Sequence, residues 1–91
     1  MSGTADAYRV EWSERAVRQL DKIDAQHARA IVHFMRDRID GLANPRAVGR
    51  PLRGERMWRY RVADYRILCR IEDAVLIVLV VEVGHRREVY R

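Results

Sequence analysis

Arginine alternates with apolar residues along the segment MWRYRVADYRILCR, from Met57 to Arg70, and these arginines are the side chains best suited to chemistry. Arg59 and Arg61 are two residues apart, so in a strand both project from the same face of a sheet. A second alternating run begins at Tyr65. Guanidinium groups stay charged at any ordinary pH and can bind two oxygens of one phosphate. A row of them on one face therefore predicts a binding surface for an anionic partner.

A two-residue turn at Ala63 and Asp64 would join the two runs into an antiparallel hairpin. In this register Arg61 lies opposite Arg66, and one face of the hairpin carries Arg59, Arg61, Arg66 and Arg70. The other face carries a predicted core of Trp58, Tyr60, Val62, Tyr65, Ile67, Cys69 and Ile71. Like charges directly across a ladder destabilise it, so an anionic ligand would explain their presence. Ala-Asp is not a preferred hairpin dipeptide, and a slip of one residue would send Arg66 to the other face.

The C-terminal segment supplies further polar groups after the last apolar run, namely His85, Arg86, Arg87 and Tyr90. Together with the arginine face they suit phosphate chemistry in which the substrate provides the nucleophile. In RNA the 2′-OH can attack the adjacent phosphate, and the protein then supplies cations around the developing charge and groups that move protons. An imidazole titrates near neutral pH, whereas a phenol does so only where positive charge lowers its pKa. This chemistry requires no metal.

Each of these groups also has a purely structural interpretation. His85 follows Gly84 and can be a turn residue, Tyr90 can pack over a sheet edge, and the arginines can serve an acidic protein instead of RNA. The sequence has no nucleophilic triad, no phosphate-binding glycine-rich loop and no paired carboxylates. His27 and His33 are six residues apart, which is not the i, i+4 spacing of helical metal ligands. We therefore expect no metal site and no cofactor.

The formal net charge of +5 comes entirely from the second half of the chain. Residues 1–45 carry seven basic and seven acidic side chains, whereas residues 46–91 carry eleven arginines and six acids. Arginine makes up 17 of the 18 basic residues, which can reflect genome composition but also suits phosphate binding. The sequence thus predicts that residues 1–45 form a neutral scaffold and that residues 46–91 carry the cationic functional surface.

Length and cysteine content predict a single domain over residues 1–91 in a reducing compartment, the cytoplasm. The chain has enough residues for one core, and its only cysteine, Cys69, cannot form an intramolecular disulfide. The longest apolar run, Ala74 to Val81, has eight residues and is too short to span a bilayer. We expect no membrane association.

Two helices are predicted before the arginine segment. The segment YRVEW alternates as a short strand, and Ser13 directly after it is a suitable helix N-cap. Asp24 can cap a second helix, whose apolar stripe runs from Ala28 to Leu42. The two helices form a hairpin that should pack on one face of a sheet.

The remaining segments predict the sheet around the arginine hairpin. Residues 46–56 mix glycine, proline and arginine, and predict an ordered loop in which Arg53 flanks the anion surface. Residues 75–83 are almost entirely aliphatic, as in a central strand buried on both faces. The order of elements predicts an α+β fold, with an N-terminal strand and helical hairpin packed on a small, mostly antiparallel sheet.

Three segments together resemble the RelE toxins of the RelE/ParE toxin–antitoxin superfamily. They are RPLRG at residues 50–54, WRYRVADYR at residues 58–66 and VGHRREVYR at residues 83–91. The resemblance covers nearly the whole length and implies the RelE-like fold. It also implies the toxin of a type II toxin–antitoxin system, which cuts mRNA in the ribosomal A site by 2′-OH attack and is disabled by a cognate antitoxin in a hetero-oligomer.

Position within these motifs implies roles for individual residues. Arg66 matches the family arginine that stabilises the transition state, and Arg86 matches the arginine after the last strand. Tyr90 matches the C-terminal tyrosine that stacks on or orients the cut nucleotide. Arg59 and Arg61 stand where well-studied members carry lysines, one of them proposed as the general base.

The two lysine-to-arginine differences leave proton transfer to other groups, because a charged guanidinium is poorly suited to act as a base. His85 and Tyr90 are the candidates, and slow turnover is the alternative. The candidate catalytic residues are therefore Arg59, Arg61, Arg66, His85, Arg86 and Tyr90. The candidate RNA-binding residues are Arg53, Arg70 and Arg87.

Two other functions are compatible with the sequence. One is a ParE-like toxin that inhibits DNA gyrase on the same fold without nuclease activity, although such toxins are not expected to carry the full arginine set with a terminal tyrosine. The other is a basic binding module with no toxicity. The resemblance favours the mRNA endonuclease over both.

Overall fold

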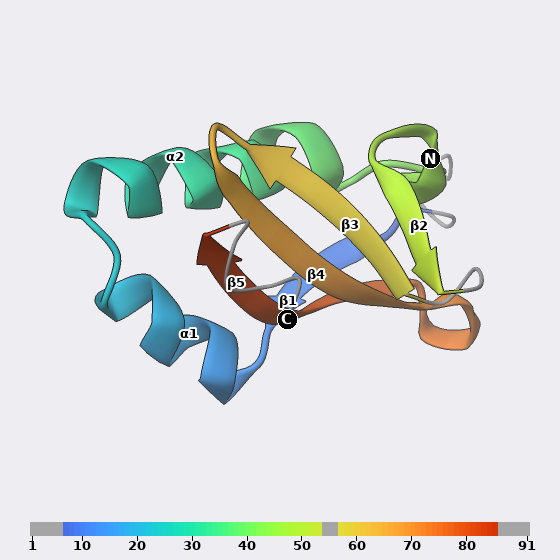
Figure 1. Ribbon diagram of the computed structural model, residues 1–91. Helices are drawn as coiled ribbons and strands as arrows, with labels where there is room; N and C mark the ends of the chain where they lie inside the picture. The colour runs from blue at the N-terminus through green and yellow to red at the C-terminus, as the bar shows by residue number, and fades with distance from the viewer. Residues whose placement is uncertain (1–6, 54–56, 86–91) are drawn as a thin grey trace.

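The computed structural model describes residues 7–53 and 57–85, which form two helices packed on one face of a five-stranded sheet (Figure 1). The helices are α1 (Glu14–Asp21) and α2 (Ala25–Phe34). The strands are β1 (Arg9–Trp12), β2 (Arg50–Arg53), β3 (Met57–Val62), β4 (Tyr65–Glu72) and β5 (Ile77–His85). This arrangement confirms the predicted α+β class, with an N-terminal strand and a helical hairpin packed on a small sheet.

The sheet has the strand order β1-β5-β4-β3-β2. β1 runs parallel to β5, and the other three pairs are antiparallel, so the sheet is mostly antiparallel as predicted. The parallel pair arises because the helical hairpin carries the chain away from β1, and β5 later returns beside it in the same direction. The middle strand is β4, and β5 lies between β4 and β1.

The prediction of a central strand over residues 75–83, buried on both faces, was wrong in two respects. The strand begins only at Ile77, because Asp73–Val75 form a 3-10 turn and Leu76 has a left-handed φ of 56°. Val75 is consequently 62% exposed. Within β5, Val78, Val80 and Val83 are buried, but the alternate residues are only partly buried, since the helices cover one face of the sheet.

Both predicted helix caps are present. The Ser13 side chain accepts a hydrogen bond from the Ala16 N–H at 3.0 Å, and the Asp24 carboxylate accepts one from the Gln26 N–H at 3.1 Å. The second helix does not continue to Leu42 as predicted. After Phe34 it widens into a π-helical turn, Met35–Ile39, before the chain reverses. The wider turn keeps Met35 and Ile39 fully buried.

Residues 46–56 were predicted as a loop, but the segment Arg50–Arg53 is an edge strand, β2, paired with β3. Two side chains of β3 hold the chain just before it. The Trp58 indole Nε1 donates to the Val48 carbonyl at 2.6 Å, and the Tyr60 hydroxyl donates to the Pro45 carbonyl at 2.7 Å. β2 is therefore aligned by long-range hydrogen bonds that local sequence does not reveal.

The core lies between the helices and the sheet. Its fully buried side chains include Ile31 from α2, Tyr60 from β3 and Cys69 from β4. Burial raises the pKa of the Cys69 thiol and of the Tyr60 phenol. Cys69 is thus a packing residue with little thiolate character, as its predicted place on the core face implied.

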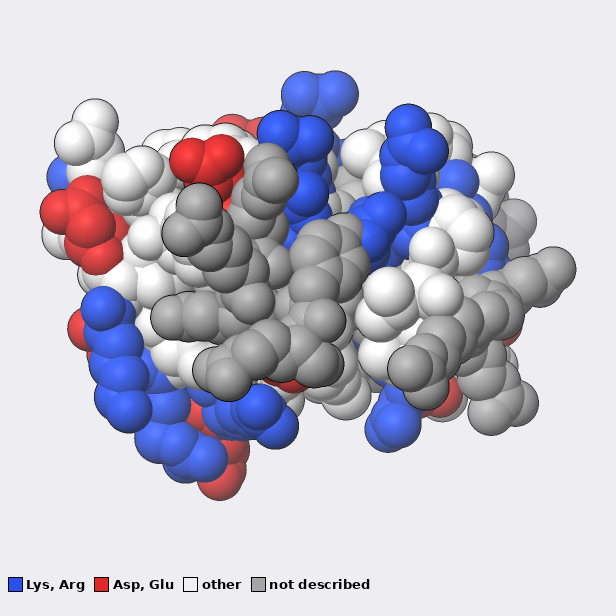
Figure 2. Space-filling view, in the orientation of Figure 1, with Lys and Arg blue, Asp and Glu red and all other residues white. Residues whose placement is uncertain are grey.

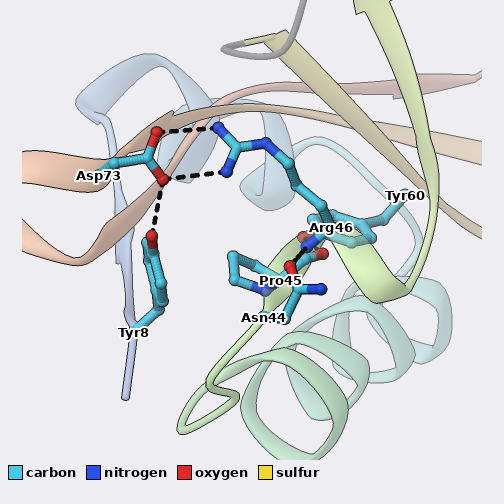
Figure 3. A network of polar contacts seen from close by, with 6 residues as sticks. All are labelled: Tyr8, Asn44, Pro45, Arg46, Tyr60 and Asp73. Atoms are coloured by element: carbon cyan, nitrogen blue, oxygen red, sulfur yellow. Dashed lines mark hydrogen bonds and ion pairs between the residues drawn. The ribbon is translucent and has the colours of Figure 1, made fainter. Parts of the chain in front are cut away.

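A polar network ties the N-terminal strand to the turn between β4 and β5 (Figure 3). The Arg46 guanidinium binds the Asp73 carboxylate through two hydrogen bonds of 2.9 and 3.0 Å, and the Tyr8 hydroxyl donates to Asp73 at 2.6 Å. The hydrogen bond to Asp73, followed by burial, raises the pKa of Tyr8. Segments far apart in sequence are joined at this one carboxylate.

Asp73→Asn is expected to lower the free energy of unfolding by about 1 kcal/mol, because Asp73 is half exposed and solvent weakens its charged hydrogen bonds. Urea unfolding measures this loss. The pKa of Tyr8 is raised in the fold, so the protonated phenol stabilises the folded state below pH 10, and this stabilisation is lost as the pH rises further. Above pH 10 the Asp73→Asn variant should therefore lose less stability with rising pH than the wild type. Asp37→Asn, which removes the exposed ion pair with Arg36, is the control and should change stability by less than about 0.5 kcal/mol.

Among the described residues, neither helix has the length and apolar character needed to cross a membrane.

Candidate anion-binding site

The β3–β4 hairpin has the predicted register. Ala63 and Asp64 form the two-residue turn, with Ala63 in the left-handed region at a φ of 52°, and Arg61 lies opposite Arg66. Arg59 lies opposite Leu68 as predicted. Ala-Asp is not a preferred dipeptide for a two-residue hairpin turn, but the turn forms because Ala63 adopts the positive φ that such turns require.

Four arginines from three strands line one pocket of about 200 Å³ on the sheet face opposite the helices. We call it the arginine pocket, and its lining residues are Gly49, Arg50, Arg59, Arg61 and Arg66. Figure 2 shows Lys and Arg side chains gathered in the upper middle of this face, over β3 and its neighbours. No carboxylate is among the lining residues that the structure describes, so the pocket has a strongly positive potential.

Arg66 is the most deeply placed of the four, with 8% of its surface exposed. It lies on β4 in the middle of the sheet, opposite Gly84 of β5, which has no side chain to fill the space above it. Burial weakens solvent screening, so an anion next to this guanidinium is attracted more strongly than at the surface. Arg66 is therefore the strongest candidate for contact with a developing negative charge.

Arg59 and Arg61 form the wall of the pocket on β3. Arg59 is partly buried and Arg61 is exposed. The Arg61 Nε donates to the Ala63 carbonyl at 3.2 Å, which anchors its side chain at the hairpin turn. Their guanidinium groups stay charged, so they can bind phosphate oxygens but cannot take up a proton.

Arg50 is the pocket residue that sequence reasoning missed. It lies on β2 and pairs with Arg59 across the ladder, which places both side chains on the same face. The sequence indicates Arg50 only weakly, because residues 46–56 contain four arginines and the glycines and proline among them favour a loop. Only the strand pairing identifies which of these arginines enters the pocket.

The structure places one of the other predicted RNA-binding residues, Arg70, outside the lining of the arginine pocket. Arg70 shares the face of the pocket residues, but its Nε is paired with the Glu72 carboxylate at 2.6 Å, two positions along β4. Arg53 ends β2 opposite Met57. Three further predicted site residues, Arg86, Arg87 and Tyr90, fall outside the described ranges.

His85 does not lie on the arginine face of the sheet. It pairs with Tyr65, and its ring meets the Tyr65 ring edge-on at a centroid distance of 5.8 Å. The Tyr65 ring also lies 5.3 Å from His27 of α2. Alternation along a strand explains the result, since Gly84 opposite Arg66 occupies the arginine face and its neighbour must face the helices. A role for His85 in proton transfer stays a prediction.

Metal ligands do not gather in residues 7–53 and 57–85, where no group of three or more His, Cys, Asp or Glu side chains could hold an ion. The arrangement suits a different task. Four cationic side chains line one pocket, and the most buried of them is Arg66, an arrangement that can bind phosphate oxygens and stabilise additional negative charge on them.

Comparison with known proteins gives a family and a close relative. Residues 10–90 match a family described as the ParE toxin of the type II toxin–antitoxin system parDE. Toxin RelG from Mycobacterium tuberculosis is 34% identical over 86 residues, an alignment that covers 92% of this chain and 97% of the relative.

Several solved structures are similar over most of their length. A chain of the toxin–antitoxin complex RelBE2 from M. tuberculosis has a TM-score of 0.77 and 32% identity, covering 90% of this chain and 94% of its own. A mutant of the E. coli toxin RelE in the free state has a TM-score of 0.74 and 24% identity, covering 92% and 90%. A chain of the archaeal RelE–RelB complex from Pyrococcus horikoshii has a TM-score of 0.68 and 23% identity, covering 87% and 94%. The last two likenesses concern the fold.

Proposed function

Since the chain belongs to the RelE/ParE superfamily of type II toxin–antitoxin toxins, we propose that it cleaves mRNA on the ribosome and that the arginine pocket holds the phosphate that reacts. The observation that carries this proposal is the convergence of four arginines from β2, β3 and β4 on one pocket without a carboxylate in its described lining. A site of this kind suits a phosphodiester substrate and offers no nucleophile of its own.

In the proposed reaction the substrate supplies the nucleophile. The ribose 2′-oxygen forms a bond to the adjacent phosphorus, the bond from phosphorus to the 5′-oxygen of the next nucleotide breaks, and the products carry a 2′,3′-cyclic phosphate and a 5′-OH. The 2′-OH loses a proton and the leaving oxygen gains one, so the reaction consumes nothing else. Arg66 stabilises the negative charge that grows on the phosphate oxygens, and Arg59 and Arg61 hold the phosphate in line.

Proton transfer and further RNA contacts are assigned to residues around the pocket. We propose that His85 or Tyr90 moves the protons and that Arg86 adds a cation, as the family resemblance implies. Arg53, Arg70 and Arg87 would bind neighbouring RNA phosphates. Because Arg59 and Arg61 cannot act as bases, turnover depends on the imidazole or the phenol.

We also propose a cognate antitoxin as the protein partner. Two of the similar structures, from M. tuberculosis and P. horikoshii, are toxin–antitoxin complexes. The positive arginine pocket would favour an acidic antitoxin segment, which would block RNA in the same place. With ribosomes as its target, the toxin would act in the cytoplasm.

A second candidate is favoured by the family description, which names the ParE toxin. A ParE-like toxin would inhibit DNA gyrase and leave mRNA whole. Brief induction of the chain in cells distinguishes the two functions: we expect new 5′ ends inside translated reading frames, mapped by primer extension, without DNA breaks. Growth arrest with gyrase-dependent DNA breaks and intact mRNA would replace the nuclease with the gyrase inhibitor, and harmless expression without any antitoxin would rule out both.

A further inference from the structure

Arg50 extends the arginine pocket to the edge strand of the sheet. β2 and β4 lie on either side of β3, and Arg50 is level with Leu68, two residues from Arg66 along β4. The backbones of Arg50 and Arg66 are therefore separated by two strand spacings across the sheet, roughly 9–10 Å, and by roughly 7 Å along it. This width exceeds what the oxygens of one phosphate group span. The two ends of the pocket therefore suit different phosphates.

The charge of the pocket leads to the same conclusion. Each phosphodiester carries one negative charge, whereas the pocket carries four guanidinium groups, two pairs of which lie directly opposite each other: Arg50 with Arg59, and Arg61 with Arg66. Like charges in direct cross-strand pairs repel. Four guanidinium groups in two such pairs offer positive charge to two neighbouring phosphates.

The position of Arg50 is set by the strand beside it. Gly49, the preceding residue, has a φ of 81°, and its backbone lies so close to β3 that an added Cβ would stand 2.4 Å from the Arg59 carbonyl oxygen. The hydrogen bond from Trp58 to Val48 fixes the residue before that. A side chain carried on a fixed backbone loses less entropy when it binds a ligand, so Arg50 is prepared for binding.

We propose that Arg50 forms a second phosphate subsite with Arg59, which it shares with the reacting phosphate. This subsite binds the RNA phosphate next to the one held by Arg61 and Arg66. The inference rests on the proposed function, because it takes single-stranded RNA as the ligand. Both subsites bind the backbone and neither reads a base, so the second one adds affinity and fixes the strand without creating a sequence preference.

The test compares short RNAs that differ by one phosphate. A 2′-O-methyl dinucleotide has one phosphodiester and the corresponding trinucleotide has two, and neither can react because the attacking hydroxyl is blocked. NMR titration of the full chain measures both affinities. We expect the wild type to bind the trinucleotide about fivefold more tightly than the dinucleotide, and Arg50→Ala to lose this gain. Arg50→Lys should recover part of it, because the charge returns without the bidentate geometry.

Arg29→Ala is the matched control, since it removes one exposed arginine from α2, on the other side of the sheet, and should keep the wild-type ratio. An Arg50→Ala variant that is folded by its NMR spectrum and still prefers the trinucleotide fivefold would overturn the second subsite. Failure of the proposed function looks different: the wild type would then leave ribosome-bound mRNA intact, or Arg66→Ala would cleave it as fast as the wild type, whatever the binding ratios. Loss of cleavage in Arg66→Ala with an unchanged ratio in Arg50→Ala would remove only the second subsite.

Discussion

Arg66→Ala is expected to lower the rate of cleavage of ribosome-bound mRNA by about 10²- to 10³-fold, the loss typical of a donor that stabilises charge in the transition state. The expected loss of rate is large because Arg66 is buried: with 8% of its surface exposed, its guanidinium acts on the phosphate with little solvent screening. Arg66→Lys should retain part of the rate, since it keeps the charge and loses the second hydrogen bond. Single-turnover cleavage with saturating toxin measures the chemical step.

The control for this prediction is again Arg29→Ala, which removes the same charge at a distance from the arginine pocket and should cleave within about threefold of the wild type. Circular dichroism and thermal unfolding establish that each variant is folded. A folded Arg66→Ala variant with the wild-type single-turnover rate would show that the buried arginine serves the fold and has no part in catalysis.

Gly49→Ala is expected to be the most destabilising small substitution near the arginine pocket. The methyl group would meet the Arg59 carbonyl oxygen, the Tyr60 ring and the Trp58 indole, all within 3 Å, on a backbone with a φ of 81°. The positive φ costs an alanine about 1–2 kcal/mol, and the collision adds about 1–3 kcal/mol. If the chain yields instead by moving β2 away from β3, Arg50 leaves the pocket.

Gly41→Ala separates the cost of the positive φ from the cost of the collision with β3. Gly41 also has a positive φ, 91°, but an added Cβ there would meet nothing within 4 Å. This variant should therefore lose only the conformational part, about 1–2 kcal/mol in urea unfolding. Equal losses of unfolding free energy in Gly41→Ala and Gly49→Ala would mean that the contact between Gly49 and β3 is loose, and Arg50 would then lack the fixed position inferred for it.

The sequence predicted the parts of the site that depend on local pattern. Alternation along a strand determines which side chains share a face, so the sequence alone predicts that Arg59, Arg61 and Arg66 lie together, and the hairpin register confirms this. The Ser13 and Asp24 caps were equally local, because a side-chain oxygen next to a helix start binds N–H groups two or three residues on.

The parts that depend on long-range pairing were missed. β2 is a strand because Trp58 and Tyr60 hold the preceding chain from across the sheet, and this tertiary effect overrides the local preference of a glycine- and proline-rich segment for a loop. The pairing of β2 with β3 is what places Arg50 in the arginine pocket. The face on which His85 lies could not be predicted for a related reason, because it depends on the register of His85 against Tyr65.

The most direct test of the proposed activity is to replace the ribose 2′-OH at the cut. Purified toxin is mixed with ribosomes carrying an mRNA in the A site, once with an all-ribose codon and once with a codon of 2′-deoxynucleotides, and the fragment ends are identified by mass spectrometry. We predict cleavage of the ribose codon to a 2′,3′-cyclic phosphate and a 5′-OH, and no cleavage of the deoxy codon. Cleavage of the deoxy codon, or an intact ribose codon, would contradict an arginine pocket that acts through the substrate's own hydroxyl.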